Sequence, residues 1–115
     1  MKKLVLSAIA VIVLIPAAIA SAYTSTGVTL NFDGSANFPN ALVHIHNNTT
    51  GANGSTNSDS NGAYTFTNLV SGTVYSYWAE KCKPNPVSGS SYFKSDTQNS
   101  SGSAPFLKLS YRNPC

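Results

Sequence analysis

Apolar and polar residues alternate along most of the chain beyond residue 22, and a period of two residues is typical of strands that bury one face. No segment in this part of the sequence has the longer period of an amphipathic helix. Clusters of Gly, Asn, Ser and Pro separate the alternating runs and indicate turns. We therefore predict an all-β fold, a seven-stranded Greek-key β-sandwich. The predicted strands are 26–32, 41–47, 55–58, 63–67, 73–81, 92–94 and 105–111.

The alternation also predicts which side chains form the core, because successive residues of a strand point to opposite faces. In segment 73–81 it places Trp78 on the face opposite Tyr75 and Tyr77, and one of these two faces must be the core face. The core residues expected from the other strands are Val28, Leu30, Phe32, Ala41, Val43, Ile45, Tyr64, Phe66, Leu69, Phe106, Leu107 and Leu109.

A tight turn is predicted at 59–62, just before the strand that begins at Ala63. Asn61-Gly62 is a strong signal for a β-hairpin, because both residues tolerate a positive φ. Asp59 is placed to accept hydrogen bonds from backbone N–H groups of the turn. The same segment resembles the middle of a calcium-binding loop, but the other acidic ligands of such a loop are missing, so turn formation is the better interpretation.

The first 22 residues have the three parts of a secretory signal peptide. Lys2 and Lys3 give a positive start, residues 4–15 are almost wholly apolar, and residues 20–22 (Ala-Ser-Ala) match a signal-peptidase site. We predict cleavage before Tyr23, a secreted, periplasmic or cell-surface location, and membrane contact only through this segment before cleavage. An uncleaved membrane anchor is the alternative, because the apolar run is long enough to span a bilayer.

The remaining residues, 23–115, are predicted to form one small domain with five basic and four acidic residues. No basic patch is present, so nucleic acid is not an expected partner. Both cysteines, Cys82 and Cys115, lie in this exported part, and two cysteines in an oxidising compartment most simply form one disulfide. An intermolecular bridge and two free thiols are the alternatives, while the lack of a C-x-x-C spacing argues against a metal–thiolate site.

Two motifs resemble those of carboxypeptidase-regulatory-like domains. Residues 38–45, Phe-Pro-Asn-Ala-Leu-Val-His-Ile, are similar to the family's G-x-P-x-x-x-A-x-V-x-V motif, although Phe38 replaces part of the glycine-containing approach to the proline. Residues 58–69, Ser-Asp-Ser-Asn-Gly-Ala-Tyr-Thr-Phe-Thr-Asn-Leu, and 72–75, Gly-Thr-Val-Tyr, are similar to its T-x-S-D-x-N-G-x-Y-x-F-x-N-L-x-x-G-x-Y run. The resemblance extends over residues 28–79 and implies a transthyretin-like (prealbumin-like) sandwich.

Domains of this family are usually non-catalytic spacer or binding modules, so the resemblance implies no enzymatic activity, no catalytic residue and no cofactor. The enzyme of this fold, hydroxyisourate hydrolase, ends in Tyr-Arg-Gly-Ser and needs a histidine on its first strand. This chain has Tyr-Arg-Asn-Pro at 111–114 and no histidine in the first predicted strand. We expect a secreted module with a structural or protein-interaction role at or outside the cell surface, and self-association by strand pairing is one form of that role. A module that binds carbohydrate or another ligand is the alternative.

Two sets of side chains are candidate binding residues. Aromatic rings that are exposed on a sandwich surface can stack on sugar rings, although for Trp78, the only tryptophan, core packing is the better interpretation. The two histidines lie two residues apart on one predicted strand face, a spacing at which they can share a metal ion, and a solvated strand face is the alternative. The candidate residues are Tyr75, Tyr77, Trp78 and Tyr92 for a ligand, and His44 and His46 for a metal.

Overall fold

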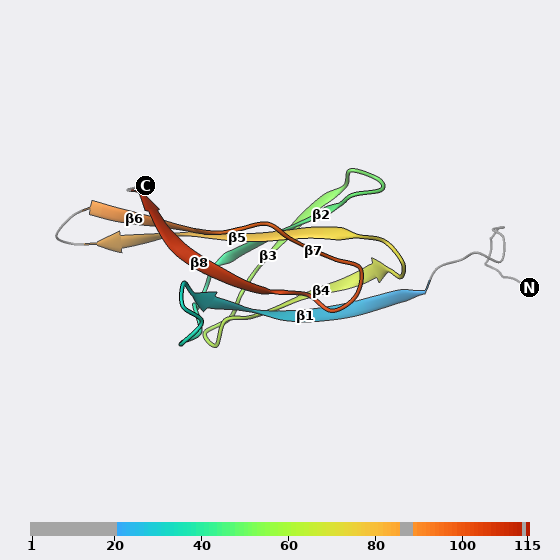
Figure 1. Ribbon diagram of the computed structural model, residues 1–115, viewed down its shortest axis with the longest axis horizontal. Coiled ribbons are helices and arrows are strands. Elements are labelled where there is room, and N and C mark those ends of the chain that lie inside the picture. The colour runs from blue at the N-terminus through green and yellow to red at the C-terminus, as the bar shows by residue number, and fades with distance from the viewer. Residues whose placement is uncertain (1–20, 86–88, 114) are drawn as a thin grey trace, which may run out of the picture.

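The computed structural model describes residues 21–85, 89–113 and 115, so the predicted signal peptide lies almost wholly outside the described residues. The described part is all-β and has no helix, which confirms the predicted class (Figure 1). It has eight strands, one more than predicted. The strands are β1 (Ala22–Asn31), β2 (Leu42–Asn47), β3 (Asn53–Asn57), β4 (Ala63–Val70), β5 (Tyr75–Asn85), β6 (Gly89–Ser95), β7 (Gln98–Ser100) and β8 (Phe106–Asn113).

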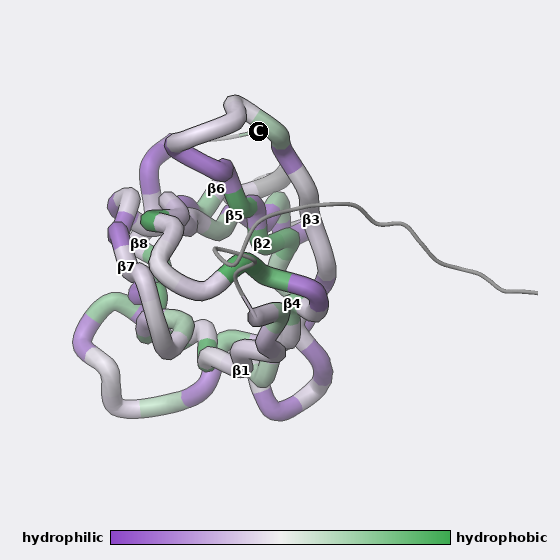
Figure 2. Tube along the Cα trace, turned by 90° about the vertical axis from the view of Figure 1, so that its right-hand side faces the viewer, coloured by the Kyte–Doolittle hydropathy of each residue, from purple (hydrophilic) through white to green (hydrophobic). Residues whose placement is uncertain are grey.

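All eight strands belong to one sheet, in the order β3-β2-β5-β6-β8-β1-β4, and β7 pairs with β5 off this path. β1 and β8 pair in parallel, and the other neighbours are antiparallel. The sheet curls until it is nearly closed, with β3 and β4 as its two edges. A view along the long axis shows the strands around a shared interior (Figure 2). Hydrogen bonding is therefore continuous through one curved sheet and is not divided between two separate sheets.

The additional strand, β7, lies in a segment that has no alternating pattern. Its residues, Gln98–Ser100, are all polar, and they pair with Tyr75–Tyr77 of β5. Because backbone hydrogen bonds, and not an apolar face, hold β7 in place, hydrophobic periodicity gives no signal for it.

The core is rich in aromatic rings, and most of the predicted inward faces are confirmed. The inward face of β5 is that of Tyr75 and Tyr77. Tyr64 is buried, and its hydroxyl donates a 2.6 Å hydrogen bond to Pro105 O. The hydroxyls of Tyr23 and Tyr77 have no hydrogen-bond partner among the described residues. The buried apolar residues are Phe38, Ala41, Val43, Ile45, Tyr64, Phe66, Leu69, Tyr75, Tyr77, Ala79, Leu107 and Leu109.

The predicted inward face of β1 is wrong. Phe32, which follows the strand, is 70% exposed, and Val28 and Leu30 are only partly buried. The ring of Tyr64 lies against the Cα of Gly27 so closely that a Cβ there would clash with it. A ring from β4 therefore fills the volume that large side chains of β1 would otherwise occupy. The buried residues of β1 are small or polar: Ser25, Gly27 and Thr29.

The expectation for Phe106 is also wrong, because its side chain is 66% exposed. Leu107 and Leu109 occupy the inward face of β8 and are almost fully buried. Alternation along the strand then places Phe106 and Lys108 on the outer face.

β4 keeps Phe66 and Leu69 in the core although they are three residues apart. Asn68 has a φ of +58°, and the pairing of β1 with β4 shifts register between Tyr23 and Ser25. A residue in the left-handed region is typical of a β-bulge, and Asn tolerates that conformation better than most residues. The bulge at Asn68 brings Leu69 back to the inward face.

The predicted turn at 59–62 forms, but it does not make a hairpin. Gly62 has a φ of +80°, and Asp59 Oδ1 accepts hydrogen bonds from Asn61 N at 2.8 Å and Ala63 N at 3.0 Å. β3 and β4, which this turn connects, pair with β2 and β1 and not with each other. The two strands therefore leave the turn as the two edges of the sheet.

The predicted disulfide is confirmed. Cys82 of β5 and Cys115, which follows β8, are bonded with their Cα atoms 6.0 Å apart. β6 lies between β5 and β8 in the sheet, so the bond links the strands on either side of it. A structural disulfide indicates an oxidising, extracellular-type environment.

Candidate functional site

Five side chains with functional chemistry come together on the outer face of β2, β5 and β6. His44 of β2 is opposite Trp78 of β5. Glu80, two residues further along β5, is opposite Lys94 of β6. Residues two apart on a strand share a face, so these side chains form one group, which we call the outer cluster. The outer cluster consists of His44, Trp78, Glu80, Tyr92 and Lys94.

The indole of Trp78 lies on this outer face and is not part of the core, so the core position predicted for it is wrong. The imidazole of His44 stacks on it, with ring centroids 4.0 Å apart and planes 17° apart. Lys94 Nζ lies 4.8 Å from the centroid of the indole, over the ring. Because β2 and β6 flank β5 on opposite sides, these two groups approach the indole from opposite sides. A sugar ring therefore has little free aromatic face at Trp78 on which to stack.

The carboxylate of Glu80 connects the outer cluster. Tyr92 Oη donates a 2.8 Å hydrogen bond to Glu80 Oε1, and His44 Nε2 lies 2.6 Å from Glu80 Oε2. Burial alone would raise the pKa of Glu80, but the hydrogen bonds from Tyr92 and His44 outweigh it and lower the pKa below its usual value. Burial and the bond to Glu80 raise the pKa of Tyr92. The network therefore holds an ionised carboxylate and a neutral phenol at neutral pH.

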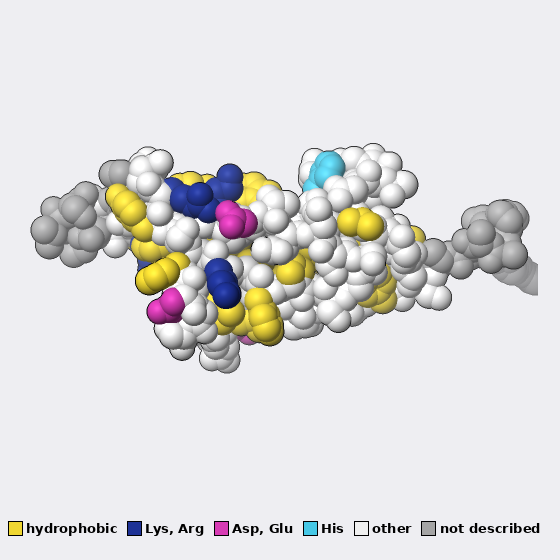
Figure 3. Space-filling view, viewed as in Figure 1, with side chains coloured by type: hydrophobic (Ala, Val, Ile, Leu, Met, Phe, Trp, Pro, Cys, Tyr) yellow, Lys and Arg dark blue, Asp and Glu magenta, His cyan; other side chains and the backbone are white. Residues whose placement is uncertain are grey.

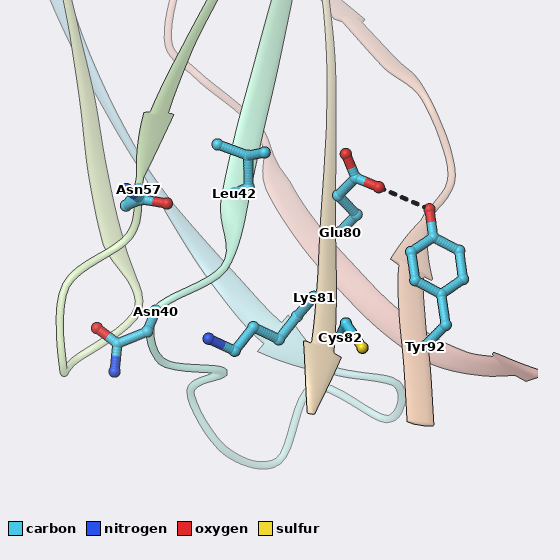
Figure 4. A pocket seen from close by; sticks show the side chains of 7 residues that line it. All are labelled: Asn40, Leu42, Asn57, Glu80, Lys81, Cys82 and Tyr92. Carbon is cyan, nitrogen blue, oxygen red and sulfur yellow. Dashed lines mark hydrogen bonds between the residues drawn. The ribbon is translucent and has the colours of Figure 1, made fainter. Parts of the chain in front are cut away.

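A cavity of about 310 Å³ opens beside the outer cluster (Figure 4). Glu80 and Tyr92 form one side of it, and Leu42 and Asn57 lie across from them. The side chain of Lys81 extends toward Asn40 at the lower side of this view. Amide, carboxylate and ammonium groups around one apolar side chain are suited to a small ligand that is rich in hydroxyl groups.

Among the described residues, the structure does not gather the two predicted metal ligands and a third ligand into one site. His44 is bound to Glu80, and His46 Nδ1 lies 2.7 Å from Asn53 Oδ1. Within the described part of the chain, no group of three or more His, Cys, Asp or Glu side chains could hold a metal ion. The alternation correctly places both histidines on one outer face, but their hydrogen bonds and the stack on Trp78 account for them without a metal.

Tyr75 and Tyr77 are buried, so they are not among the exposed aromatic rings from which a ligand-binding role was predicted. They are 5% and 0% exposed, and burial raises the pKa of Tyr77 to about 12. The hydroxyl of Tyr75 accepts a 2.8 Å hydrogen bond from Val70 N. Of the four aromatic candidates, Trp78 and Tyr92 lie on the outer face.

A second concave region lies between the two sheet edges. It has a volume of about 320 Å³, and we call it the edge groove. Its rim carries amide groups, including those of Asn53 of β3 and Asn68 of β4. An apolar floor with a polar rim is the usual composition of a binding surface. The floor is formed by the buried side chains of Ile45, Phe66, Leu69 and Tyr75.

The edge groove is uncharged, whereas the outer cluster is not. No charged residue lines the groove, and residues 60–79, which include β4, contain none. In the space-filling view, Lys and Arg side chains gather over one half of the visible face, and the half that bears the projecting β2–β3 hairpin is mostly uncharged (Figure 3). The charged residues of the described part are Asp33, Asp59, Glu80, Lys81, Lys83, Lys94, Asp96, Lys108 and Arg112.

Sequence reasoning missed Glu80, Lys94 and the edge groove. The spacing of Glu80, two residues after Trp78, is a signal that places both on one face. The groove has no such signal, because β2, β3, β4 and β5 all contribute to it and only the curvature of the sheet brings them together.

Comparisons of the chain with family models, with curated proteins and with solved structures find no match. Among the described residues there is no helix with the length and apolar character needed to cross a membrane.

Proposed function

We propose that this chain is a non-catalytic structural module, exported to or beyond the cell surface, that assembles with copies of itself by pairing its free sheet edges. The observation that carries the proposal is the composition of these edges. In the described part, β3 pairs only with β2 and β4 only with β1, and neither edge strand contains a charged residue or a proline. Proteins that must avoid edge-to-edge pairing usually place such residues there.

The bulge at Asn68 is the one protective feature of these edges, and it lies near the end of β4. It leaves the stretch 63–66 in regular register with β1, so the outward N–H and C=O groups of this stretch can extend the sheet. A strand added there forms backbone hydrogen bonds that need no particular side chains.

We also propose that the domain is transthyretin-like and related to carboxypeptidase-regulatory-like domains. The motif segments support this because residues 38–45 lead into β2 and residues 58–69 form the tight turn and most of β4. In this interpretation the curved sheet corresponds to a seven-stranded Greek-key sandwich, and the short β7 is an addition. The disulfide and the predicted signal peptide support export from the cytoplasm.

Lysine substitutions at the two edges test the proposed assembly. The full chain is expressed with its own leader, purified in oxidised form, and examined by sedimentation velocity over a range of concentrations and by electron microscopy. We expect concentration-dependent assembly of the wild type and monomers for Ser55→Lys on β3 and Thr67→Lys on β4, because an ammonium group at an edge opposes pairing.

Thr97→Lys is the matched control, since it adds the same charge at an exposed position after β6 and should leave assembly unchanged. A wild type that stays monomeric at every concentration contradicts the proposal. Assembly of both edge variants to the wild-type extent also contradicts it.

Carbohydrate binding is the second candidate function, and the cavity beside the outer cluster is the observation that favours it. Tyr92 offers a partly exposed ring and Glu80, Asn40 and Asn57 offer hydrogen-bonding groups around about 310 Å³. In a glycan array we expect Tyr92→Ala to remove the signal and Trp78→Ala to weaken it less, because the indole faces are already covered. An unchanged signal for folded Tyr92→Ala, or no signal for the wild type, argues against this candidate.

A further inference from the structure

Exposed apolar side chains border the cavity of the edge groove. Val70, at the end of β4, lines the groove and is 41% exposed. Val74 precedes Tyr75 of the groove floor and is 42% exposed. Thr73 N donates a 3.2 Å hydrogen bond to Val70 O, and this turn holds the two valines near each other. We call residues 68–75 the rim segment.

Gly54 of β3 keeps the groove open. It is opposite Ile45 in the pairing of β2 with β3, and both residues line the groove. A Cβ at this position would meet Ile45 Cγ2 at 3.3 Å, so any side chain there would occupy part of the opening. Gly54 does not have the positive φ that would require glycine for the backbone. A glycine inside a strand often marks a place where another backbone or ligand approaches closely.

We infer that the edge groove is the contact site for a second copy of this chain, with the rim-segment valines of each copy seated in the groove of the other. The inference rests on the proposed self-assembly and specifies the surface that directs it. In a two-fold contact the same patch is used on both copies, so it must be complementary to itself. The cavity and the two valines lie within one surface patch, so this patch can be complementary to itself.

The charge distribution favours a second copy over a charged partner. The groove and the residues between 60 and 79 have no charged group, so two copies can approach without like-charge repulsion. A charged partner would lose hydration here and find no group of opposite sign. The amides of Asn53 and Asn68 at the rim can hydrogen-bond to the backbone of the rim segment.

The experiment measures the dissociation constant of self-association by sedimentation equilibrium, with the full oxidised chain expressed with its leader. Gly54→Val fills the groove, and Val70→Ser removes one of the valines that would enter it. We expect each substitution to weaken association at least about tenfold, as for the loss of one buried valine. Gly102→Val is the matched control, because it makes the same change at an exposed loop position away from the groove and both sheet edges, where a Cβ meets no neighbour within 4 Å, and it should leave the dissociation constant unchanged.

Thermal unfolding checks that each variant is folded, since Ile45 must shift slightly to accept a side chain at position 54. Wild-type association in both Gly54→Val and Val70→Ser, together with its loss in Ser55→Lys, overturns the inference and leaves the proposed edge pairing in place. Loss of association in Gly54→Val with wild-type behaviour of Ser55→Lys and Thr67→Lys supports the groove contact and contradicts edge pairing.

A synthetic peptide of residues 68–75 (Asn-Leu-Val-Ser-Gly-Thr-Val-Tyr) gives a readout that does not depend on assembly. Binding is followed by NMR shifts of backbone amides in β3 and β4. Shifts in the wild type that are absent in Gly54→Val support the groove as the site for the rim segment, even in a protein that stays monomeric. A peptide that causes no shifts, added to a protein that stays monomeric, overturns the inference together with the proposed function.

Discussion

The two ends of the molecule are held together in different ways. At one end, β5, β6 and β8 are hydrogen-bonded side by side, and the Cys82–Cys115 disulfide links the strands that flank β6. At the other end, β3 and β4 diverge from a shared turn and leave the edge groove between them. On the face shown in Figure 3 the charged side chains lie toward the first end, and no charged residue lines the groove. Small domains often depend on a covalent cross-link for stability, and here the cross-link lies at the end opposite the groove.

Removing the disulfide is expected to cause the largest loss of stability. It tests whether the end that carries the disulfide stabilises the whole domain. We expect Cys82→Ser combined with Cys115→Ser to lower the free energy of unfolding by about 3–4 kcal/mol, the loop-entropy estimate for a cross-link of this span. Urea unfolding monitored by circular dichroism measures the loss. A double variant within about 1 kcal/mol of the wild type would show that the paired strands alone stabilise this end.

Two buried tyrosines sharpen the comparison, because Tyr64 lies on the edge strand β4 and Tyr77 on the central strand β5. Tyr64→Phe leaves the carbonyl of Pro105 without its 2.6 Å hydrogen bond, and we expect a loss of about 1–2 kcal/mol in urea unfolding. Tyr77→Phe removes a hydroxyl that has no partner among the described residues, and we expect no loss or a slight gain. Equal effects of the two substitutions would contradict this distinction.

The outer cluster, which lies beside the strands linked by the disulfide, should make the free energy of unfolding depend on pH. The pKa of Glu80 is lowered in the folded state, so its contribution is present above the ordinary value of 4.5 and is lost as the pH falls through the folded-state pKa. We expect the free energy of unfolding of Glu80→Gln to fall less than that of the wild type between about pH 5 and pH 3. Parallel pH profiles of the two proteins would show that the network does not favour the ionised carboxylate.

The smallest change in stability is expected at the open edge. Thr67→Lys adds a charge to an exposed side chain of β4, and we expect thermal unfolding to show a change within about 0.5 kcal/mol. The same variant is predicted to remove self-association. It should therefore lose edge pairing while the monomer keeps its stability. A large loss of stability would show that β4 is more constrained than its single pairing partner indicates.

The sequence predicted local features well. The inward face of β2, the cluster of Tyr64, Phe66 and Leu69, and the turn at 59–62 all follow from side chains acting on their own segment. The disulfide followed from the number of cysteines and the predicted export, because only one intrachain pairing is possible. These features depend on neighbours in the chain or on simple counting.

Features that depend on distant segments were missed. The face of β1 was predicted wrongly because the ring of Tyr64, from another strand, occupies the space over Gly27. Asn61-Gly62 makes its turn, yet pairing of β3 with β2 and of β4 with β1 prevents a hairpin. Core packing was favoured for Trp78, but Tyr75 and Tyr77 face inward instead, because neighbouring strands decide which face of β5 is covered.

The sequence by itself determined that the chain forms strands, where its tight turn lies and which cysteines join, because these depend on backbone propensity, alternation and oxidation. The tertiary structure decided which strands became edges and which aromatic rings remained outside. It also decided where the cavity beside the outer cluster and the edge groove formed. The curvature of the sheet sets these properties. Curvature results from all the strand pairings together, and no single segment encodes it.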